Sequence, residues 1–202
     1  MFTVHGDLKM EKETTHCRIF RDSKNNAVAL QDIFDLGIYY PWDDGHNPNF
    51  DAFSRVILDV KDQHIKGINY CTNSLRSFLS STEEYVICVI PTHAVGTAPS
   101  GIRTIAKQLC SHSVVDGTDV ISRVFEIPKK TVGESNDMQS EIKSLAVTDE
   151  SVVRGRQVLL LDDVTTTGTS LKAGKYLIEQ AGAELVVLLA LARTQIGYES
   201  VK

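Results

Sequence analysis

The chain has 202 residues, of which 42% are hydrophobic and 23% are charged, and its formal net charge is −5. This size and composition are typical of one globular domain with a modest extension. The negative charge argues against nucleic-acid binding through a broad basic surface. The cysteines lack any Cys-x-x-Cys spacing, which favours reduced structural thiols. The charged N-terminus does not resemble a signal peptide and no apolar run could cross a bilayer, so we expect a cytoplasmic protein.

The first part of the chain, residues 1–84, has a mixed pattern. A strand-like segment at residues 16–20 precedes a turn-rich segment at residues 39–50. Apolar residues then recur at steps of three and four over residues 53–81, which predicts amphipathic helices. We therefore treat residues 1–84 as an N-terminal part of one integrated domain whose core is residues 85–202.

From residue 85 onward, apolar β-rich runs alternate with helical segments. Continuous apolar strands separated by helices are typical of a parallel sheet covered on both faces. We therefore expect an α/β fold with a central parallel sheet of about five strands flanked by helices. The expected strands are residues 85–91, 120–127, 157–164 and 184–194, and the expected helices are residues 101–109 and 168–182, the latter ending at Gly182.

The segment VLLLDDVTTTGTS, residues 158–170, carries the strongest chemical signal. It places adjacent acids, Asp162 and Asp163, and a threonine-rich turn where a buried strand gives way to a helix. Ligands of open parallel sheets bind at this edge, where the amides of the next helix favour anions. Hydroxyl donors and the tight turn at Gly168 predict a phosphate cradle. Acids beside a phosphate need ligand hydroxyls or a hard cation as partners, and a sugar phosphate with Mg²⁺ supplies both.

This segment resembles the phosphoribosyl-pyrophosphate (PRPP) signature of the type I phosphoribosyltransferases. The general layout is similar over about residues 85–194, and FSRVILDVKD and LALART are similar to the ComF-like branch. The resemblance implies the type I phosphoribosyltransferase fold with a small N-terminal hood. It also implies that Asp162 and Asp163 hold the ribose hydroxyls, directly or through Mg²⁺, and that the 5-phosphate is bound by Thr165, Thr166, Thr167, Gly168 and Thr169. The alternative, a helix-capping turn, leaves the threonines unexplained.

Two further segments fit the layout of such a site. PTHAVGTAPSGIR, residues 91–103, follows a strand and precedes a helix, so Thr92, His93 and Ala94 could contact pyrophosphate; the alternative is an ordinary turn. The polar stretch at residues 126–145 is long for a connection, and the resemblance implies a lid there. The cations in or just before this stretch are Arg123, which we assign to pyrophosphate binding, Lys130, which we assign to catalysis, and Lys129 and Lys143. The alternative is a solvated cluster of charges, whose positive field is weakened by nearby acids such as Glu141.

The function implied by the resemblance is transfer of ribose 5-phosphate from PRPP to a nucleobase or amine, with release of pyrophosphate. Cleavage at the ribose carbon builds positive charge on the sugar, so no protein nucleophile is needed. The alternatives are a PRPP or nucleotide sensor and an accessory protein that keeps only the fold. We expect PRPP, pyrophosphate and an unidentified acceptor as partners, without membrane or nucleic acid, and leave a homodimer open. Aromatic residues that could stack on a base or belong to the core are Tyr39, Tyr40, Trp42 and Phe50.

Overall fold

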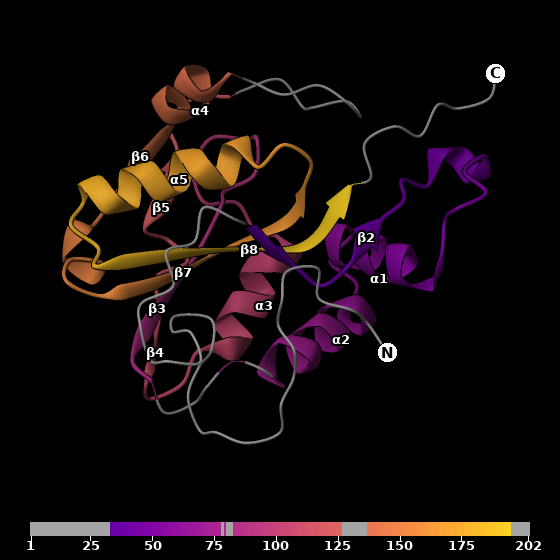
Figure 1. Cartoon of the computed structure of the whole chain (residues 1–202), viewed down its shortest axis with the longest axis horizontal. Helices are drawn as coiled ribbons and strands as arrows, with labels where there is room; N and C mark the ends of the chain where they lie inside the picture. The colour runs from indigo at the N-terminus through magenta and orange to yellow at the C-terminus, as the bar shows by residue number, and fades with distance from the viewer. Residues whose placement is uncertain (1–32, 78, 80–82, 127–136, 195–202) are drawn as a thin grey trace.

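The computed structural model describes residues 33–77, 79, 83–126 and 137–194. Its centre is a six-stranded sheet in which every described pair of neighbouring strands is parallel (Figure 1). The expected central parallel sheet is therefore confirmed. The strand order is β1 (Ile33–Asp35), β8 (Leu185–Thr194), β7 (Gln157–Thr165), β3 (Tyr85–Val89) and β4 (Val114–Asp116), with β2 (Ile38–Tyr39) pairing with β8 beyond β1.

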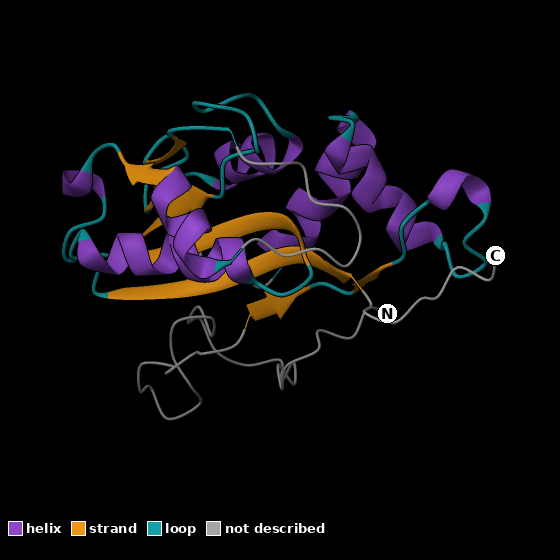
Figure 2. Ribbon diagram, turned by 90° about the horizontal axis from the view of Figure 1, so that it is seen from above, coloured by secondary structure: helices purple, strands orange, loops and turns teal. Residues whose placement is uncertain are grey.

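Helices cover both faces of this sheet, as the alternation of strands and helices predicted (Figures 1 and 2). Leu159 and Leu161 of β7 pack into one hydrophobic cluster, whereas Val158 and Leu160 pack into the other. This division follows from the alternation of side chains along a strand. The first cluster is covered by α1 (Ala52–Lys61), α2 (Ile65–Arg76) and α3 (Gly101–Leu109), and the second by α4 (Met138–Ser144) and α5 (Thr169–Gln180).

The N-terminal helices form where the apolar spacing predicted them. Asp51 caps α1 by accepting a hydrogen bond from the backbone N–H of Ser54 at 2.7 Å. Phe53, Ile57 and Val60 then lie one helical turn apart and are buried against the sheet. Strands β1 and β2 were not expected, and the strand-like segment at residues 16–20 lies outside the described residues. Two short 3₁₀ turns complete the described elements, η1 (Asp43–Gly45) and η2 (Glu150–Val152).

The β-rich segment at residues 120–127 corrects our expectation for the sheet. Its strand, β5 (Ile121–Arg123), pairs antiparallel with β6 (Leu145–Val147) in a separate two-stranded ribbon. The place beside β3 is taken by β4, a short strand with one buried residue. The prediction of a strand was right but its place in the central sheet was wrong, because a run of β-forming residues does not specify its partner.

Candidate functional site

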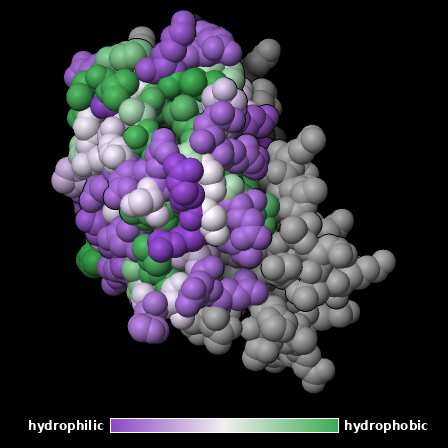
Figure 3. Space-filling view, turned by 90° about the vertical axis from the view of Figure 1, so that its left-hand side faces the viewer, coloured by the Kyte–Doolittle hydropathy of each residue, from purple (hydrophilic) through white to green (hydrophobic). Residues whose placement is uncertain are grey.

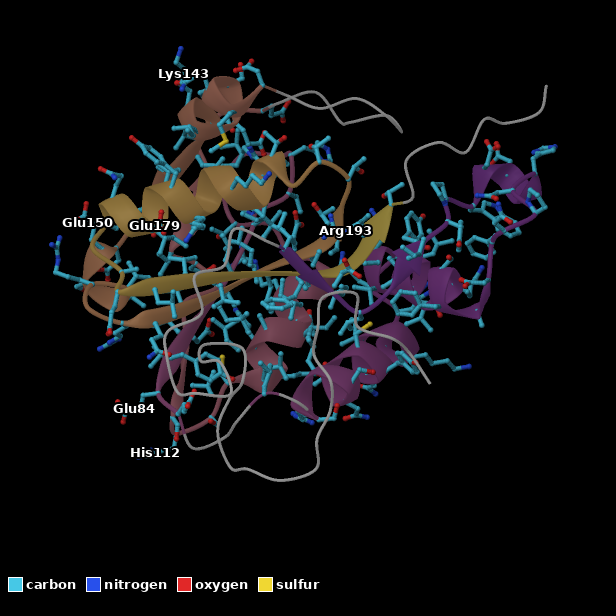
Figure 4. The ribbon with its side chains drawn as sticks, in the orientation of Figure 1. Glu84, His112, Lys143, Glu150, Glu179 and Arg193 are labelled. Atoms are coloured by element: carbon cyan, nitrogen blue, oxygen red, sulfur yellow. The ribbon has the colours of Figure 1, made fainter. Side chains whose placement is uncertain are left out.

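The carboxyl ends of β3, β7 and β8 open into a pocket of about 710 Å³. Figure 4 shows Arg193 at this end of β8, whereas Glu150 and Glu179 lie at the opposite, amino end. The surface on the amino side carries many hydrophilic side chains, and its hydrophobic side chains gather mainly toward the top of the view (Figure 3). The pocket thus lies where ligands of parallel sheets are expected. Its lining comes from residues 162–164, 166 and 170 of the signature segment, residues 90–93 and 99–102, residues 39, 41, 58 and 60–63 of the N-terminal part, and single residues of β5, α4 and β8.

The paired acids lie at the end of β7 and both line the pocket. Leu161 and Val164 contact the same hydrophobic cluster although they are three residues apart. An ideal strand would place them on opposite faces, so the strand is distorted between them, although β7 stays paired in register with β8 up to Thr165. Asp162 Oδ1 accepts a hydrogen bond from the N–H of Asp163 at 2.9 Å, and Asp163 Oδ1 accepts one from Val164 at 2.6 Å. Both adjacent carboxylates line the same pocket, where they could contact one ligand.

The pKa values at the acid pair are shifted by burial and by neighbouring charges. Asp162 is shielded from bulk water, and this burial raises the pKa of its carboxyl group well above the ordinary value. The negative charge of Asp163 raises that pKa further. Lys61, the last residue of α1, lies with Nζ 3.5 Å from Asp163 Oδ2. Burial lowers the pKa of Lys61, but the neighbouring Asp163, Tyr39 and Asp162 outweigh it and leave that pKa raised. Sequence reasoning missed Lys61, because a lysine at a helix end usually lies in solvent.

The threonine turn connects the acids to α5. Thr166 lines the pocket, as does Ser170 in the first turn of the helix. Thr165 is buried at the end of β7, and the hydroxyl groups of Thr167 and Thr169 lie 2.9 Å apart in a hydrogen bond. The first N–H groups of a helix have no partners within it, and its dipole favours an anion there. The turn therefore has the features of a phosphate cradle.

Gly168 holds this turn in shape. Its φ of 77° is in the left-handed region, and it begins α5 without a side-chain cap. A Cβ atom at this position would lie 2.2 Å from Cδ1 of Ile33 in β1. Glycine is therefore favoured here by the left-handed backbone, and any larger residue would also have to displace the end of the Ile33 side chain.

The segment expected to hold pyrophosphate borders the pocket beside the acids. Thr92 and His93 line it, whereas Ala94 is not among the lining residues. The hydroxyl oxygen of Thr92 is buried and has no hydrogen-bond partner within the described ranges. A buried hydroxyl without a partner is costly, so a ligand oxygen would satisfy it.

Arg123 lies on β5, not in a lid, and its side chain is buried at the edge of the pocket. Its Nε donates to the carbonyl oxygen of Thr92 at 3.0 Å, and Nη2 donates to that of Pro91 at 3.3 Å. Nη2 also lies 3.4 Å from Oε1 of Glu141, which is fully buried on α4. Burial lowers the pKa of Arg123, partly offset by Glu141. The guanidinium group thus ties α4 to the backbone of the 91–92 segment.

Most of the other expected cations and aromatic residues do not line the pocket or lie outside the described residues. Lys129 and Lys130 lie outside the described residues. Lys143 is exposed on α4 and points away from the sheet (Figure 4). Tyr39 is buried and lines the pocket. Trp42 and Phe50 instead pack edge to face with ring centroids 4.8 Å apart, and neither they nor Tyr40 are lining residues.

Within the described parts of the chain, no group of three or more His, Cys, Asp or Glu side chains is arranged to hold a metal ion. Asp162 and Asp163 nevertheless fit Mg²⁺, which is commonly held by one or two carboxylates together with oxygens of a bound phosphate ligand. None of the described helices has the length and apolar character needed to cross a bilayer.

Residues 78–202 match the phosphoribosyl transferase domain. The chain is 26% identical over 140 residues to the adenine phosphoribosyltransferase of Desulforamulus reducens, covering 66% of this chain and 81% of that protein. It is 34% identical over 70 residues to the adenine phosphoribosyltransferase of Bifidobacterium longum, covering 35% of this chain and 36% of that protein. The match to the latter relative thus spans little more than a third of its length.

Similar solved structures include the adenine phosphoribosyltransferase of Thermoanaerobacter pseudethanolicus, with 15% identity and a TM-score of 0.44 over 67% of this chain and 84% of that one. Another is a phosphoribosyltransferase of Corynebacterium diphtheriae, with 17% identity and a TM-score of 0.37 over 71% of this chain and 96% of that one. The domain match covers more than half of the chain and includes the whole signature. This chain therefore belongs to the phosphoribosyl transferase domain family, as its resemblance to the type I enzymes predicted.

Proposed function

We propose that the protein is a phosphoribosyltransferase that transfers the ribose 5-phosphate of PRPP to a nucleobase or amine and releases pyrophosphate. One observation carries this proposal: a single pocket brings together the adjacent acids, Thr166 and Ser170 at the threonine turn, and the 91–93 segment. These three features match the three parts of PRPP, which are a ribose with free hydroxyls, a 5-phosphate and a pyrophosphate.

The threonine turn would bind the 5-phosphate through the N-terminal amides of α5 and the hydroxyls of Thr166 and Ser170. Asp162 and Asp163 would accept hydrogen bonds from the two ribose hydroxyls. Thr92 and His93 would face the pyrophosphate, with the unpartnered Thr92 hydroxyl as a donor. The ribose carbon that reacts would then lie between the acids and the 91–93 segment.

Mg²⁺, when bound with PRPP, would be held by ligand oxygens and by Asp162 and Asp163, and would neutralise charge on the leaving pyrophosphate. The residues of this chain would contribute by position and charge. The carboxylates would stabilise the positive charge that develops on the ribose ring, and the amides would hold the 5-phosphate still. Arg123 would act as a positioning residue, because its side chain holds the carbonyl groups of Pro91 and Thr92. Lys130 stays a prediction for the catalytic cation.

The acceptor would bind against the N-terminal part of the pocket, where Tyr39, Leu58 and Gln63 form a mixed apolar and polar wall. We propose adenine as the first acceptor to test, because the similar proteins from Desulforamulus reducens and Bifidobacterium longum are adenine phosphoribosyltransferases. A ComF-like affiliation, a cytoplasmic location and a homodimer remain predictions from the sequence.

The test is pyrophosphate release in the presence of PRPP and Mg²⁺ with adenine, hypoxanthine, guanine, orotate, uracil and simple amines offered one at a time. Release that depends on one acceptor, together with formation of the corresponding ribosylated product, is the expected result. Tight PRPP binding without release under any of these conditions would contradict the proposal and indicate a sensor. The Asp163→Ala variant serves as the negative control for contaminating activity.

A further inference from the structure

Lys61 supplies a positive charge directly to the acid pair. Its Nζ lies 3.5 Å from Asp163 Oδ2 and 5.7 Å from the centroid of the Tyr39 ring. Among the residues that line the described pocket, the other side chains that can carry positive charge are His93 and Arg123. Arg123 is occupied by Glu141 and by backbone carbonyl groups. Lys61 is therefore the lysine or arginine of the lining that forms an ion pair with one of the acids, whereas Arg123 acts on Asp162 through charge alone, with no ion pair or hydrogen bond between these two described residues.

The pair has the properties of a contact that can open. The side chains of Lys61 and Asp163 are 36% and 33% exposed, so solvent reaches both charges. An ammonium group on a flexible stem forms a weak, exchangeable ion pair at such a position. The ring of Tyr39 helps to hold the ammonium group near Asp163 through a cation–π contact. Lys61 can therefore neutralise Asp163 without being locked to it.

A divalent cation approaching Asp162 and Asp163 would be repelled by this ammonium group. At distances of a few ångströms, like charges in a partly desolvated pocket repel by several times the thermal energy. PRPP would reduce this repulsion, because its phosphate groups carry negative charge. The ammonium group could pair with a phosphate once the acids bind the ribose and the metal ion. The same lysine would thus oppose a metal ion that arrives alone and tolerate one that arrives with the ligand.

We propose that Lys61 is a built-in counter-ion of the paired acids, which holds Asp163 in the free protein and keeps the pocket from binding a divalent cation alone. The assignment of the ligand rests on the proposed function, but the ion pair and its effect on cation affinity do not. Lys61 is thereby a positioning and selectivity residue of the site.

The test measures the affinity of the purified chain for Mn²⁺ alone, by calorimetry and by the electron paramagnetic resonance signal of free Mn²⁺. Mn²⁺ is used because, like Mg²⁺, it prefers carboxylate oxygens and has a spectroscopic signal. Lys61→Met keeps an unbranched side chain and removes the charge; we expect it to bind Mn²⁺ roughly tenfold or more tightly than the wild type. Lys61→Arg should remain like the wild type.

Lys107→Met is the matched control, because Lys107 is exposed on α3 and the substitution removes the same charge away from the pocket. Adding Asp163→Asn to Lys61→Met should abolish the gain. Lys61→Gln is measured in parallel, and circular dichroism checks that each variant is folded. Equal Mn²⁺ affinity in the wild type, Lys61→Met and Lys61→Gln, or no detectable binding by either of these two variants, would overturn the proposal. Because neither PRPP nor turnover is involved, this result is separate from failure of the proposed transferase activity.

Discussion

The two halves of the pocket differ in how the chain builds them. The signature half, residues 162–170, is one continuous stretch at the end of β7 and the start of α5. The assembled half collects single residues from separate elements, among them Lys61 of α1, Thr92 after β3, Arg123 of β5 and Glu141 of α4. The first half is set by local backbone geometry, whereas the second depends on the packing of the whole domain.

The two halves of the pocket would therefore have different roles in ligand binding. The signature half offers amides, hydroxyls and carboxylates that would recognise groups common to PRPP and ribose 5-phosphate. The assembled half tunes charge through Lys61, fixes the 91–92 segment through Arg123 and forms the wall at which an acceptor would bind. Substitutions in the first half should therefore affect phosphate-ligand binding most, and those in the second should affect stability or acceptor use.

Among single substitutions, the largest effect is expected in the threonine turn. Thr166→Glu places a negative charge and added bulk where the 5-phosphate would bind, so PRPP affinity should fall by roughly three orders of magnitude, about 4 kcal/mol. Calorimetric titration with PRPP and Mg²⁺ measures this loss. Ser111→Glu, on an exposed residue next to β4, adds the same charge and should leave the affinity unchanged. If Thr166→Glu still binds PRPP, the 5-phosphate does not bind at this turn.

The next effect concerns the buried ion pair of the assembled half. Glu141→Gln leaves the Arg123 guanidinium buried without its counter-charge, so the free energy of unfolding should fall by about 3 kcal/mol. Urea denaturation measures the loss. Glu150→Gln is the matched control, because Glu150 pairs with Arg154 in solvent and should change the stability by less than about 0.5 kcal/mol. Similar losses in the two variants would mean that the buried pair does not stabilise the domain.

A smaller effect is expected at Gly168, where the left-handed backbone and the contact with Ile33 both disfavour a side chain. Gly168→Ala strains a left-handed residue and presses a methyl group against Ile33, which should cost about 2 kcal/mol of stability and weaken phosphate binding. Gly155→Ala is the control, because Gly155 has a φ of 68° but open space where a Cβ would lie. It should cost about 1 kcal/mol and leave phosphate binding intact. Thermal unfolding with and without phosphate distinguishes strain from damage to the cradle.

The smallest effect should come from the acceptor wall. Gln63 has a φ of 58° and lines the pocket, and asparagine tolerates this conformation while withdrawing the amide. Gln63→Asn should raise the KM for the acceptor by roughly threefold, about 0.7 kcal/mol, and leave PRPP affinity unchanged. Steady-state kinetics with PRPP and acceptor varied in turn provide the measurement. A loss confined to PRPP would place the acceptor elsewhere.

The sequence was most informative where function is local. The bounds of α3, residues 101–109, and the strand, turn and helix around the signature could be predicted because apolar periodicity, Gly168 and the acids lie within a few residues of one another. The membership in the phosphoribosyl transferase domain family followed from the same stretch.

The assembled half could not be predicted in this way. Glu141 looked like one of several lid acids, yet it is buried and pairs with Arg123. Lys61 and Asp163 are distant in sequence, and no pattern in either segment indicates the other. The short strands β1 and β2 acquire their structure by pairing with β8, so their own residues carry little periodic signal. In each case the determining contact is tertiary.

The central claim is that the paired acids hold the ribose while the threonine turn holds the phosphate. Its most direct test compares PRPP with inorganic phosphate as ligands of the double variant Asp162→Asn, Asp163→Asn, using calorimetry in Mg²⁺. Each lost charge-assisted hydrogen bond is worth about 1.5–3 kcal/mol, so PRPP binding should weaken by about 3–6 kcal/mol. Phosphate binding should be unchanged or slightly tighter, because two negative charges are removed. Equal losses for both ligands would contradict the account and show that Asp162 and Asp163 only shape the turn.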